Sequence, residues 1–313
     1  MPRSQRNSSY RIIIETTTLT IFTPTFNRAH LLRRVYESLV TQSCRDFEWL
    51  VVDDGSTDFT RSLVESFIRE GRIPVRYIYK ENGGLHTAYN TAYAEISAEL
   101  CVCIDSDDFM PEDAVEIIVN TWREKGSDKY AGLIGLDCRL DTMEPIGGPF
   151  PEGLTECYFL DLKTKGIHHG DSKQVMRTEL MKQVAPQIGF EGEKNFNPVY
   201  MLLQVCDTRP LLVVNECLCI VDYQNDGFSM SANIFRQYID SPRSFAKLRR
   251  LEMTLQRSTF VNSARCAVHY VSSCLIAGDK DWLSNSPRKL LTLAAYPAGW
   301  LLSKYILRKS SRC

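Results

Sequence analysis

The stretch WLVVDDGS at residues 49–56 places two carboxylates and a Gly-Ser turn directly after a short apolar run. A second stretch, CVCIDSDD at residues 101–108, repeats the arrangement with three carboxylates. Carboxylates at the ends of apolar strands are poor core material, but they are well suited to holding a divalent cation and the diphosphate of a nucleotide. The two stretches therefore predict strands whose carboxyl ends carry a ligand site.

Outward from these stretches, apolar runs alternate with helical patterns. Strands are predicted at residues 19–23, 48–52, 75–79, 101–104, 131–136 and 211–221, and the helical patterns cover residues 31–39, 63–68, 85–96 and 115–122, with Pro111 in the first turn of the last. Continuous apolar strands that alternate with helices are typical of an α/β fold with a mostly parallel sheet covered on both faces. Ligands on such sheets bind beyond the carboxyl ends of the strands.

Four polar motifs follow one another along this pattern. They are TPTFNR at 23–28, VDDGSTD at 52–58, NGG at 82–84 and DSDD at 105–108. In this order and approximate spacing, the chain resembles the inverting family 2 glycosyltransferases of GT-A fold over about residues 19–112. The resemblance implies a nucleotide-sugar donor, a mostly parallel central sheet flanked by helices, and a GT-A catalytic domain at residues 19–235. It leaves a tail at residues 1–18 and a basic helical extension at residues 236–313.

The resemblance also implies roles for the residues of the donor half. Asp107 corresponds to the direct ligand of Mg²⁺ or Mn²⁺, and Asp105 lies nearer the ribose or shares the metal. Asp53 corresponds to the residue that contacts the nucleotide base. The remaining donor residues would line the nucleotide pocket, where glycine allows close approach of the backbone; they are Thr23, Pro24, Asn27 and Gly84.

The acceptor half needs a carboxylate that takes the proton from the attacking hydroxyl. The resemblance places this base well after the metal motif, where four acidic residues are candidates. Glu193 is the first choice and Glu191 the second, ahead of Asp171 and Asp226. The Glu-Asp pair of many relatives is replaced here by Glu193-Lys194.

Charge is unevenly distributed along the chain. Residues 236–313 contain 14 Lys or Arg but only 4 Asp or Glu, although the whole chain has a formal net charge of −1. Residues 290–303 carry no charge and include Trp300, between basic flanks. Such a segment is too short to span a bilayer and favours lying on an anionic membrane surface, the alternative being a helix packed on the catalytic domain. We expect peripheral membrane association.

The cysteines and the N-terminus bear on the cellular compartment. None of the 11 cysteines forms a Cys-x-x-Cys pair, which argues against a zinc site. Residues 1–9 contain no apolar core of signal-peptide length. We therefore expect reduced thiols and a cytoplasmic protein, on the inner face of the cell membrane.

Together these features predict a metal-dependent, inverting transferase that moves a sugar from a nucleotide donor, with a UDP-sugar as the first expectation, to a hydroxyl of a lipid-linked or growing glycan. The resemblance and the tail suggest bacterial surface polysaccharide synthesis, without a nucleic-acid partner. Two alternatives remain: a nucleotidyltransferase-like enzyme, and a degenerate domain that binds nucleotide or sugar as a scaffold. A nucleotidyltransferase-like enzyme would need a glycine-rich loop that binds the triphosphate, and residues 24–27 do not provide one.

Overall fold

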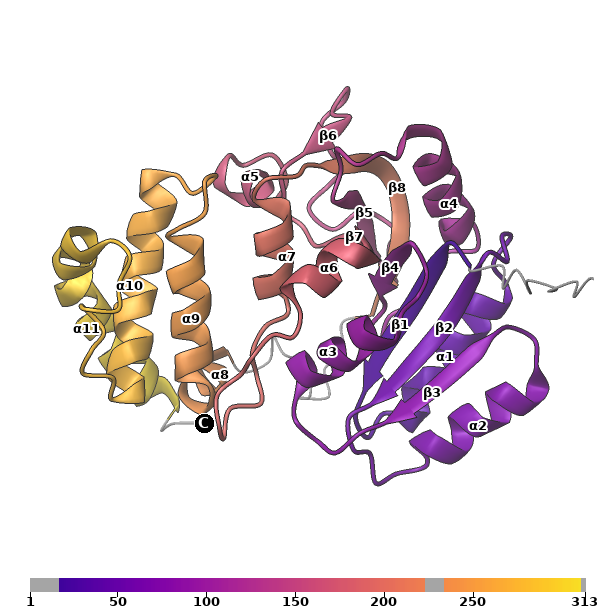
Figure 1. Cartoon of the computed structure of the whole chain (residues 1–313), viewed down its shortest axis with the longest axis horizontal. Helices are drawn as coiled ribbons and strands as arrows, with labels where there is room; N and C mark the ends of the chain where they lie inside the picture. Colours follow the sequence, from indigo (N-terminus) through magenta and orange to yellow (C-terminus); the bar gives the residue numbers. More distant parts are fainter. Residues whose placement is uncertain (1–16, 223–233, 311–313) are drawn as a thin grey trace, which may run out of the picture.

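The computed structural model describes residues 17–222 and 234–310. Its centre is an eight-stranded sheet in the order β3-β2-β1-β4-β7-β5-β8-β6 (Figure 1). Six strands run parallel to one another: β1 Leu19–Thr25, β2 Phe47–Asp53, β3 Val75–Tyr79, β4 Leu100–Cys103, β5 Gly132–Arg139 and β8 Leu211–Val221. The α/β fold with a mostly parallel sheet is confirmed, and all six are strands that the apolar runs predict.

Two strands run against the others, and the sequence pattern does not predict them. β7 (Ser172–Arg177) lies between β4 and β5 and is antiparallel to both. β6 (Glu156–Cys157) pairs antiparallel with β8 at the sheet edge. Only three residues of β7 are buried, so its sequence lacks the apolar run that identifies the other strands. This strand matters because it brings residues 172–174 beside the end of β4.

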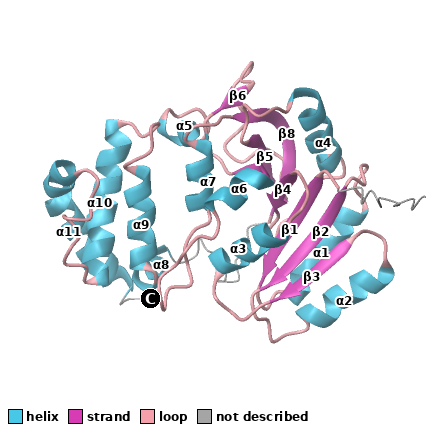
Figure 2. Cartoon of the chain, viewed as in Figure 1, coloured by secondary structure: helices cyan, strands magenta, loops and turns pink. Residues whose placement is uncertain are grey.

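Helices cover both faces of the sheet (Figure 2). On one face, α1, α2 and α4 bury the aromatic stack of Tyr36, Trp49 and Phe67. On the other face, α3, α5, α6 and α7 pack against residues such as Phe22 and Met176. The bounds of these helices are α1 Ala29–Val40, α2 Thr60–Glu70, α3 Leu85–Glu95, α4 Ala114–Lys125, α5 Phe159–Thr164, α6 Thr178–Val184 and α7 Val199–Cys206.

The sequence pattern predicts that Pro111 lies in the first turn of α4, and this prediction is wrong. The helix begins at Ala114, and Pro111 lies before it, where its carbonyl accepts hydrogen bonds from the Ala114 amide and from the Gln42 side chain. The proline therefore closes the loop after β4 against α1. That loop carries the DSDD motif.

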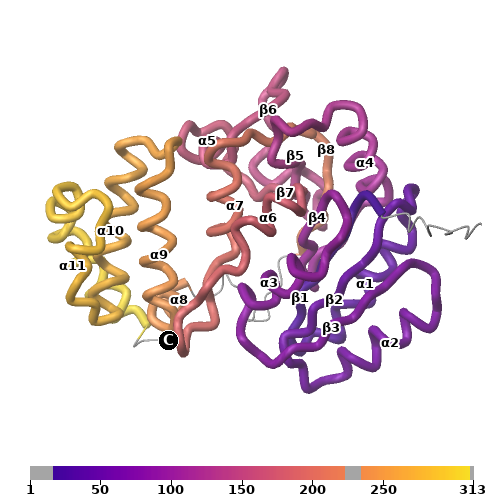
Figure 3. The backbone as a smooth tube through the Cα atoms, viewed as in Figure 1, coloured from indigo at the N-terminus to yellow at the C-terminus, as the bar shows by residue number. Residues whose placement is uncertain are grey.

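After residue 234 the described chain is helical, as the basic composition predicts. The helices are α8 Ile234–Asp240, α9 Pro242–Glu252, α10 Phe260–Ala277 and α11 Lys289–Ser310. They share a small core of their own, centred on Tyr270 and Val271. A second cluster joins α9 to α7 through Leu248 and Leu203, and Figure 3 shows α7 lying between the sheet and the C-terminal helices.

Candidate active site

A cleft of about 1220 Å³ opens at the carboxyl ends of the parallel strands. The end of β1 contributes Pro24 to its wall, the loop that follows contributes Arg28, and the loop after β4 contributes the whole DSDD motif of residues 105–108. Opposite these loops, the wall is formed by residues of α7 and by Leu248, Arg249 and Glu252 of α9. The cleft therefore lies between the sheet edge and the C-terminal helices, where the sequence predicts a ligand.

Within the DSDD motif, Asp107 forms an ion pair with Arg28 across the cleft mouth. The Arg28 Nη1 donates to Asp107 Oδ2 at 2.9 Å and to Ser106 Oγ at 3.3 Å. Arg34 of α1 donates to the Asp107 backbone carbonyl and, at 2.6 Å, to Asp222. Two arginines from the β1–α1 segment thus hold the loop that carries the motif.

A buried lysine lies behind the motif. Lys173 of β7 is 3.9 Å from Asp108 Oδ2 and 3.7 Å from Asp137 Oδ1 of β5. Desolvation raises the pKa of Asp108 to about 8 and that of Asp137 to about 6, although Lys173 opposes both shifts. The surrounding carboxylates hold the pKa of Lys173 well above its ordinary value, despite its burial. Lys173 therefore remains a cation at neutral pH.

The Asp105 side chain is exposed to the cleft, but the walls of the cleft exclude part of the solvent around it. This desolvation raises the pKa of its carboxyl. Repulsion from Asp107 acts in the same direction, while Lys173 lowers this pKa. In the described ranges, no three His, Cys, Asp or Glu side chains gather into a preformed metal cage. A divalent cation that uses one or two carboxylates together with substrate phosphates needs no such cage. Asp105 and Asp107 fit that kind of site.

Of the two carboxylates after β2, Asp54 rather than Asp53 lines the cleft. Asp53 is buried and accepts hydrogen bonds from the Ser56 amide at 2.7 Å and from the Tyr77 hydroxyl at 2.6 Å. Asp54 pairs with Lys80 at 2.5 Å and accepts the amides of Gly83 and Gly84 at 3.0 and 2.8 Å. The structure thus turns Asp53 away from the predicted base pocket, because its oxygens close the Asp-Gly-Ser turn.

Two further predicted donor residues also lie outside the cleft wall. Thr23 is fully buried in β1, where its hydroxyl accepts the Trp49 indole N–H at 3.0 Å. Asn27 adopts a positive φ of 54°, exchanges hydrogen bonds with Ser56 and Thr57, and links the two loops. Strand alternation explains the first case, because the adjacent residues Phe22 and Pro24, which point to the opposite face of β1, line the cleft instead.

Gly84 lines the cleft as predicted, at the start of α3. Its φ is +94°, and a Cβ there would lie 2.1 Å from the Lys194 carbonyl oxygen. Lys194 Nζ also donates to Asn82 Oδ1 at 2.5 Å. Only glycine allows the segment around residue 194 to close against the NGG loop.

Glu193, the first choice for the base, is bound to the start of α9. Its two carboxylate oxygens accept the backbone amides of Arg243 and Ser244 at 3.0 and 2.8 Å, the Arg243 Nε at 2.9 Å and the Ser244 hydroxyl at 2.7 Å. The side chain is only 4% exposed and does not line the cleft. This geometry argues against Glu193 as the base, because its lone pairs already satisfy a helix N-terminus.

Glu191 is exposed, and its backbone carbonyl accepts a hydrogen bond from Arg243. Its side chain is not part of the cleft wall either. Of the other two candidates, Asp171 lies in the wall one residue before β7, and Asp226 falls outside the described residues. The loop at 188–194 therefore does not bring its carboxylates to the cleft.

Sequence reasoning missed several cleft residues. Lys173 lies on the unpredicted strand β7, and Asp137 continues β5 beyond its predicted end at residue 136. His168 is 5% exposed, lines the cleft, and has no hydrogen-bond partner for either ring nitrogen among the described residues. Of these residues, only Asp137 has a signal in the sequence that could have identified it, because it is an acidic residue in an otherwise apolar run.

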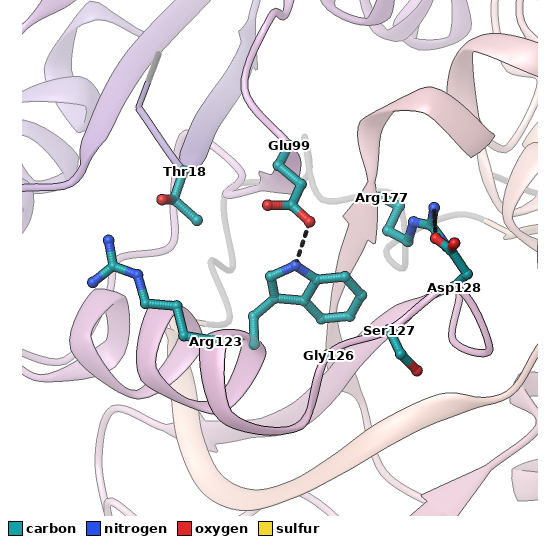
Figure 4. A pocket seen from close by; sticks show the side chains of 8 residues that line it. Thr18, Glu99, Arg123, Gly126, Ser127, Asp128 and Arg177 are labelled. Atoms are coloured by element: carbon teal, nitrogen blue, oxygen red, sulfur yellow. Dashed lines mark hydrogen bonds and ion pairs between the residues drawn. The ribbon is translucent and has the colours of Figure 1, made fainter. Parts of the chain in front are cut away.

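A smaller cavity of about 270 Å³ lies at the opposite edge of the sheet (Figure 4). Its polar groups are paired with each other: Trp122 Nε1 donates to Glu99 at 2.7 Å, and Arg177 donates to Asp128 at 2.8 Å. These contacts join α4 to the amino end of β4 and to the end of β7. The polar side chains of this cavity therefore have a structural role, which is to connect these elements.

Comparison with known proteins identifies the domain that holds the cleft. Residues 20–136 match the family model "Glycosyl transferase family 2". The chain carries a family 2 glycosyltransferase domain. Curated relatives include glycosyltransferase GlyA of Streptococcus pneumoniae, 33% identical over 36% of this chain and 16% of the relative. Another is poly(ribitol-phosphate) β-N-acetylglucosaminyltransferase TarP of Staphylococcus aureus, 29% identical over 38% of this chain and 37% of TarP. The matched stretches thus span well under half of these relatives.

Solved structures show a likeness in fold over most of the chain. S. aureus TarS 1–349, in complex with UDP-GlcNAc, superposes with a TM-score of 0.60 at 16% identity, covering 89% of this chain and 79% of that one. A Pyrobaculum calidifontis mannosyltransferase, in complex with GDP-Man and Mn²⁺, gives a TM-score of 0.54 at 17% identity, covering 92% and 87%. The GT-A fold predicted from the motifs is confirmed.

Proposed function

We propose that this protein transfers a sugar from a nucleotide-diphosphate donor, a UDP-sugar in the first instance, to a hydroxyl of a glycan or lipid-linked acceptor, with inversion at the anomeric carbon. The observation that carries the proposal is the DSDD motif at the carboxyl end of β4, facing a cleft of about 1220 Å³ in a family 2 domain. The complex of TarS with UDP-GlcNAc supports the choice of donor nucleotide.

Asp107 and Asp105 would hold a Mg²⁺ or Mn²⁺ ion, which neutralises the negative charge that grows on the leaving diphosphate. The residues fit such an ion because, in the part of the chain that the structure describes, the carboxylates of Asp105, Asp107 and Asp137 outnumber the two cations that pair with side chains of this cluster, Lys173 and Arg28. Arg28 lies 2.9 Å from Asp107 and is placed to contact a diphosphate oxygen once the donor binds. The neighbour solved with GDP-Man and Mn²⁺ supports the metal.

For the acceptor half, Asp171 is the carboxylate that we propose as the base. Of the described candidates it alone lines the cleft, because Glu193 is bound to α9 and Glu191 lies outside the wall. The base would take the proton from the acceptor hydroxyl while that oxygen bonds to the anomeric carbon and the diphosphate leaves. The relatives named for polysaccharide synthesis, TarP and the chondroitin synthase of Escherichia coli, support a glycan acceptor in a bacterial surface polymer.

The test is release of free nucleotide from a panel of UDP-, GDP- and dTDP-sugars, with Mn²⁺ or Mg²⁺, in the presence of glycan acceptors. We expect release from one nucleotide class, and its loss in Asp107→Ala and in Asp171→Asn. Activity that survives both EDTA and Asp107→Ala would overturn the metal assignment. Donor binding without turnover across the panel would instead favour the scaffold alternative, and full activity of Asp171→Asn would exclude Asp171 as the base.

A further inference from the structure

The last helix, α11, buries its small side. Thr292, Gly299 and Ser303 face the protein, and a Cβ on Gly299 would lie 2.6 Å from the Cβ of Val271 on α10. Helices of soluble proteins normally turn their large apolar residues inward and their polar residues outward. In α11 three of the four buried residues are small or hydroxyl-bearing, the fourth being Ile306, and this lets the helix pack tightly on α10.

The outward face of α11 carries the large apolar residues. Seven are exposed, by 38% to 85%: Leu290, Leu293, Tyr296, Trp300, Leu301, Tyr305 and Leu307. Exposed aliphatic and aromatic residues gathered on one helix mark an interaction surface. Figure 1 places α11 at the end of the molecule away from the β1–β3 edge of the sheet, with its outer side uncovered by other described elements.

The charges on and beside this face are all basic. Residues 282–310 include Arg288, Lys289, Lys304, Arg308 and Lys309 but no Asp or Glu. Lys304 Nζ lies 6.0 Å from the Trp300 ring centre, and Lys309 Nζ lies 5.9 Å from that of Tyr305. Long cationic side chains beside interfacial aromatic rings can extend toward phosphate headgroups while the rings enter the apolar boundary.

The docking of α11 decides how it would meet a bilayer. It has 22 residues and contains an 18-residue window of mean hydropathy 1.2, which by length and composition is enough to cross a membrane, and it is the one such helix among the described residues. However, both halves of the helix contact the rest of the protein. The ring centres of Tyr296 and Trp282 lie 5.3 Å apart in a stacked pair, and those of Tyr305 and Phe235 lie 5.7 Å apart. A helix fixed along its length cannot cross a bilayer without leaving α10, so it is oriented to lie in the surface plane.

We propose that α11 is a membrane-surface helix. Its outward apolar face enters the headgroup–acyl boundary of an anionic bilayer, and its basic residues contact the lipid phosphates. An acidic protein partner would offer negative charge without an apolar face, and a second copy of this chain would offer an apolar face without negative charge. An anionic bilayer offers both over the full length of the helix. The proposal is independent of the proposed sugar transfer, because none of the α11 residues lines the cleft.

The test is flotation of the full chain with two kinds of vesicle, phosphatidylcholine alone and phosphatidylcholine with 30–40% phosphatidylglycerol (a composition of roughly cytoplasmic-leaflet charge). We expect binding to the anionic vesicles that weakens as salt rises. The variant Leu293→Ser/Leu301→Ser should bind at least about tenfold more weakly, since each leucine gives up apolar contact with lipid. Arg308→Gln/Lys309→Gln should lose about fivefold per charge.

The matched control is Phe59→Ser/Ile68→Ser, which removes two exposed apolar residues from the start and face of α2. It should bind the vesicles like the unaltered chain, and circular dichroism should report unchanged helix content for all variants. Sedimentation without lipid tests the second copy. A dimer that Leu293→Ser/Leu301→Ser dissociates, with no vesicle binding by the unaltered chain, would overturn the proposal. Equal binding to neutral and anionic vesicles would overturn its electrostatic part.

Discussion

Replacing Glu193 should destabilise the protein rather than only slow its reaction. The carboxylate accepts two backbone amides at the start of α9 and the buried Ser244 hydroxyl. Loss of a helix cap costs about 1–2 kcal/mol, and leaving a buried donor without its charged acceptor costs about 1–3 kcal/mol more. We therefore expect Glu193→Ala to lower the free energy of unfolding by about 3 kcal/mol, which corresponds to roughly 4–5 °C in Tm for a chain of this size.

The assay is thermal and urea unfolding of the full chain, followed by circular dichroism, beside nucleotide release at a temperature where all variants are folded. Glu191→Ala is the matched control, because that neighbouring carboxylate is exposed and outside the cleft wall. It should unfold like the unaltered chain. If Glu193→Ala unfolds normally but has lost transfer, the reasoning is refuted and Glu193 is the base after all.

Three further outcomes follow from the geometry. Gly84→Ala should destabilise the NGG loop and weaken donor binding at least tenfold, measured by calorimetric titration with UDP, because its Cβ would meet the Lys194 carbonyl at 2.1 Å; unchanged affinity would contradict the close approach. Asp107→Ala should abolish Mn²⁺-dependent nucleotide release, and an activity insensitive to EDTA would count against it. Burial, with repulsion from Arg249 and Arg265, lowers the pKa of His269 from 6.5 to about 4. Between these pH values the unfolded chain binds a proton that the folded chain does not, so the free energy of unfolding falls as pH drops from 6.5 toward 4. His269→Gln should remove about 2–3 kcal/mol of that fall in urea titrations, and an identical dependence of stability on pH in the variant would exclude this histidine.

The sequence identified the parallel part of the fold because each of those strands is a continuous apolar run. It located Pro24, Gly84, Asp105 and Asp107 at the cleft, because motif residues at the carboxyl ends of parallel strands converge on one edge. It could not decide which of two adjacent carboxylates turns into the cleft. Asp53 and Asp54 differ by one position, and the hydrogen bonds of a tight turn, rather than composition, determine where each points.

The acceptor half was less predictable for a different reason. The base was sought near Gly192 by spacing alone, but the contact that governs Glu193 comes from Ser241–Ser244, about 50 residues later in the chain. Such a pairing leaves no local signal, since a carboxylate that caps a distant helix and one that removes a proton look alike in sequence. The sequence predicts that the C-terminal region is helical and basic, but it does not predict that these helices pack onto this loop.

Strand β7 shows why the electrostatics of the cleft depend on topology. Its antiparallel insertion between β4 and β5 brings Lys173 within 4 Å of both Asp108 and Asp137. Arg28 is the second cation paired with this cluster. A pKa of about 8 leaves Asp108 largely protonated at neutral pH, so Asp105, Asp107 and Asp137 still outnumber the two cations. A divalent cation would offset that excess negative charge. In Lys173→Met the excess negative charge would grow, so we expect the carboxylates to bind Mn²⁺ more tightly, measured as a lower Mn²⁺ concentration for half-maximal nucleotide release, while donor affinity without metal falls. An unchanged metal requirement in a folded Lys173→Met protein would show that Lys173 does not tune this site.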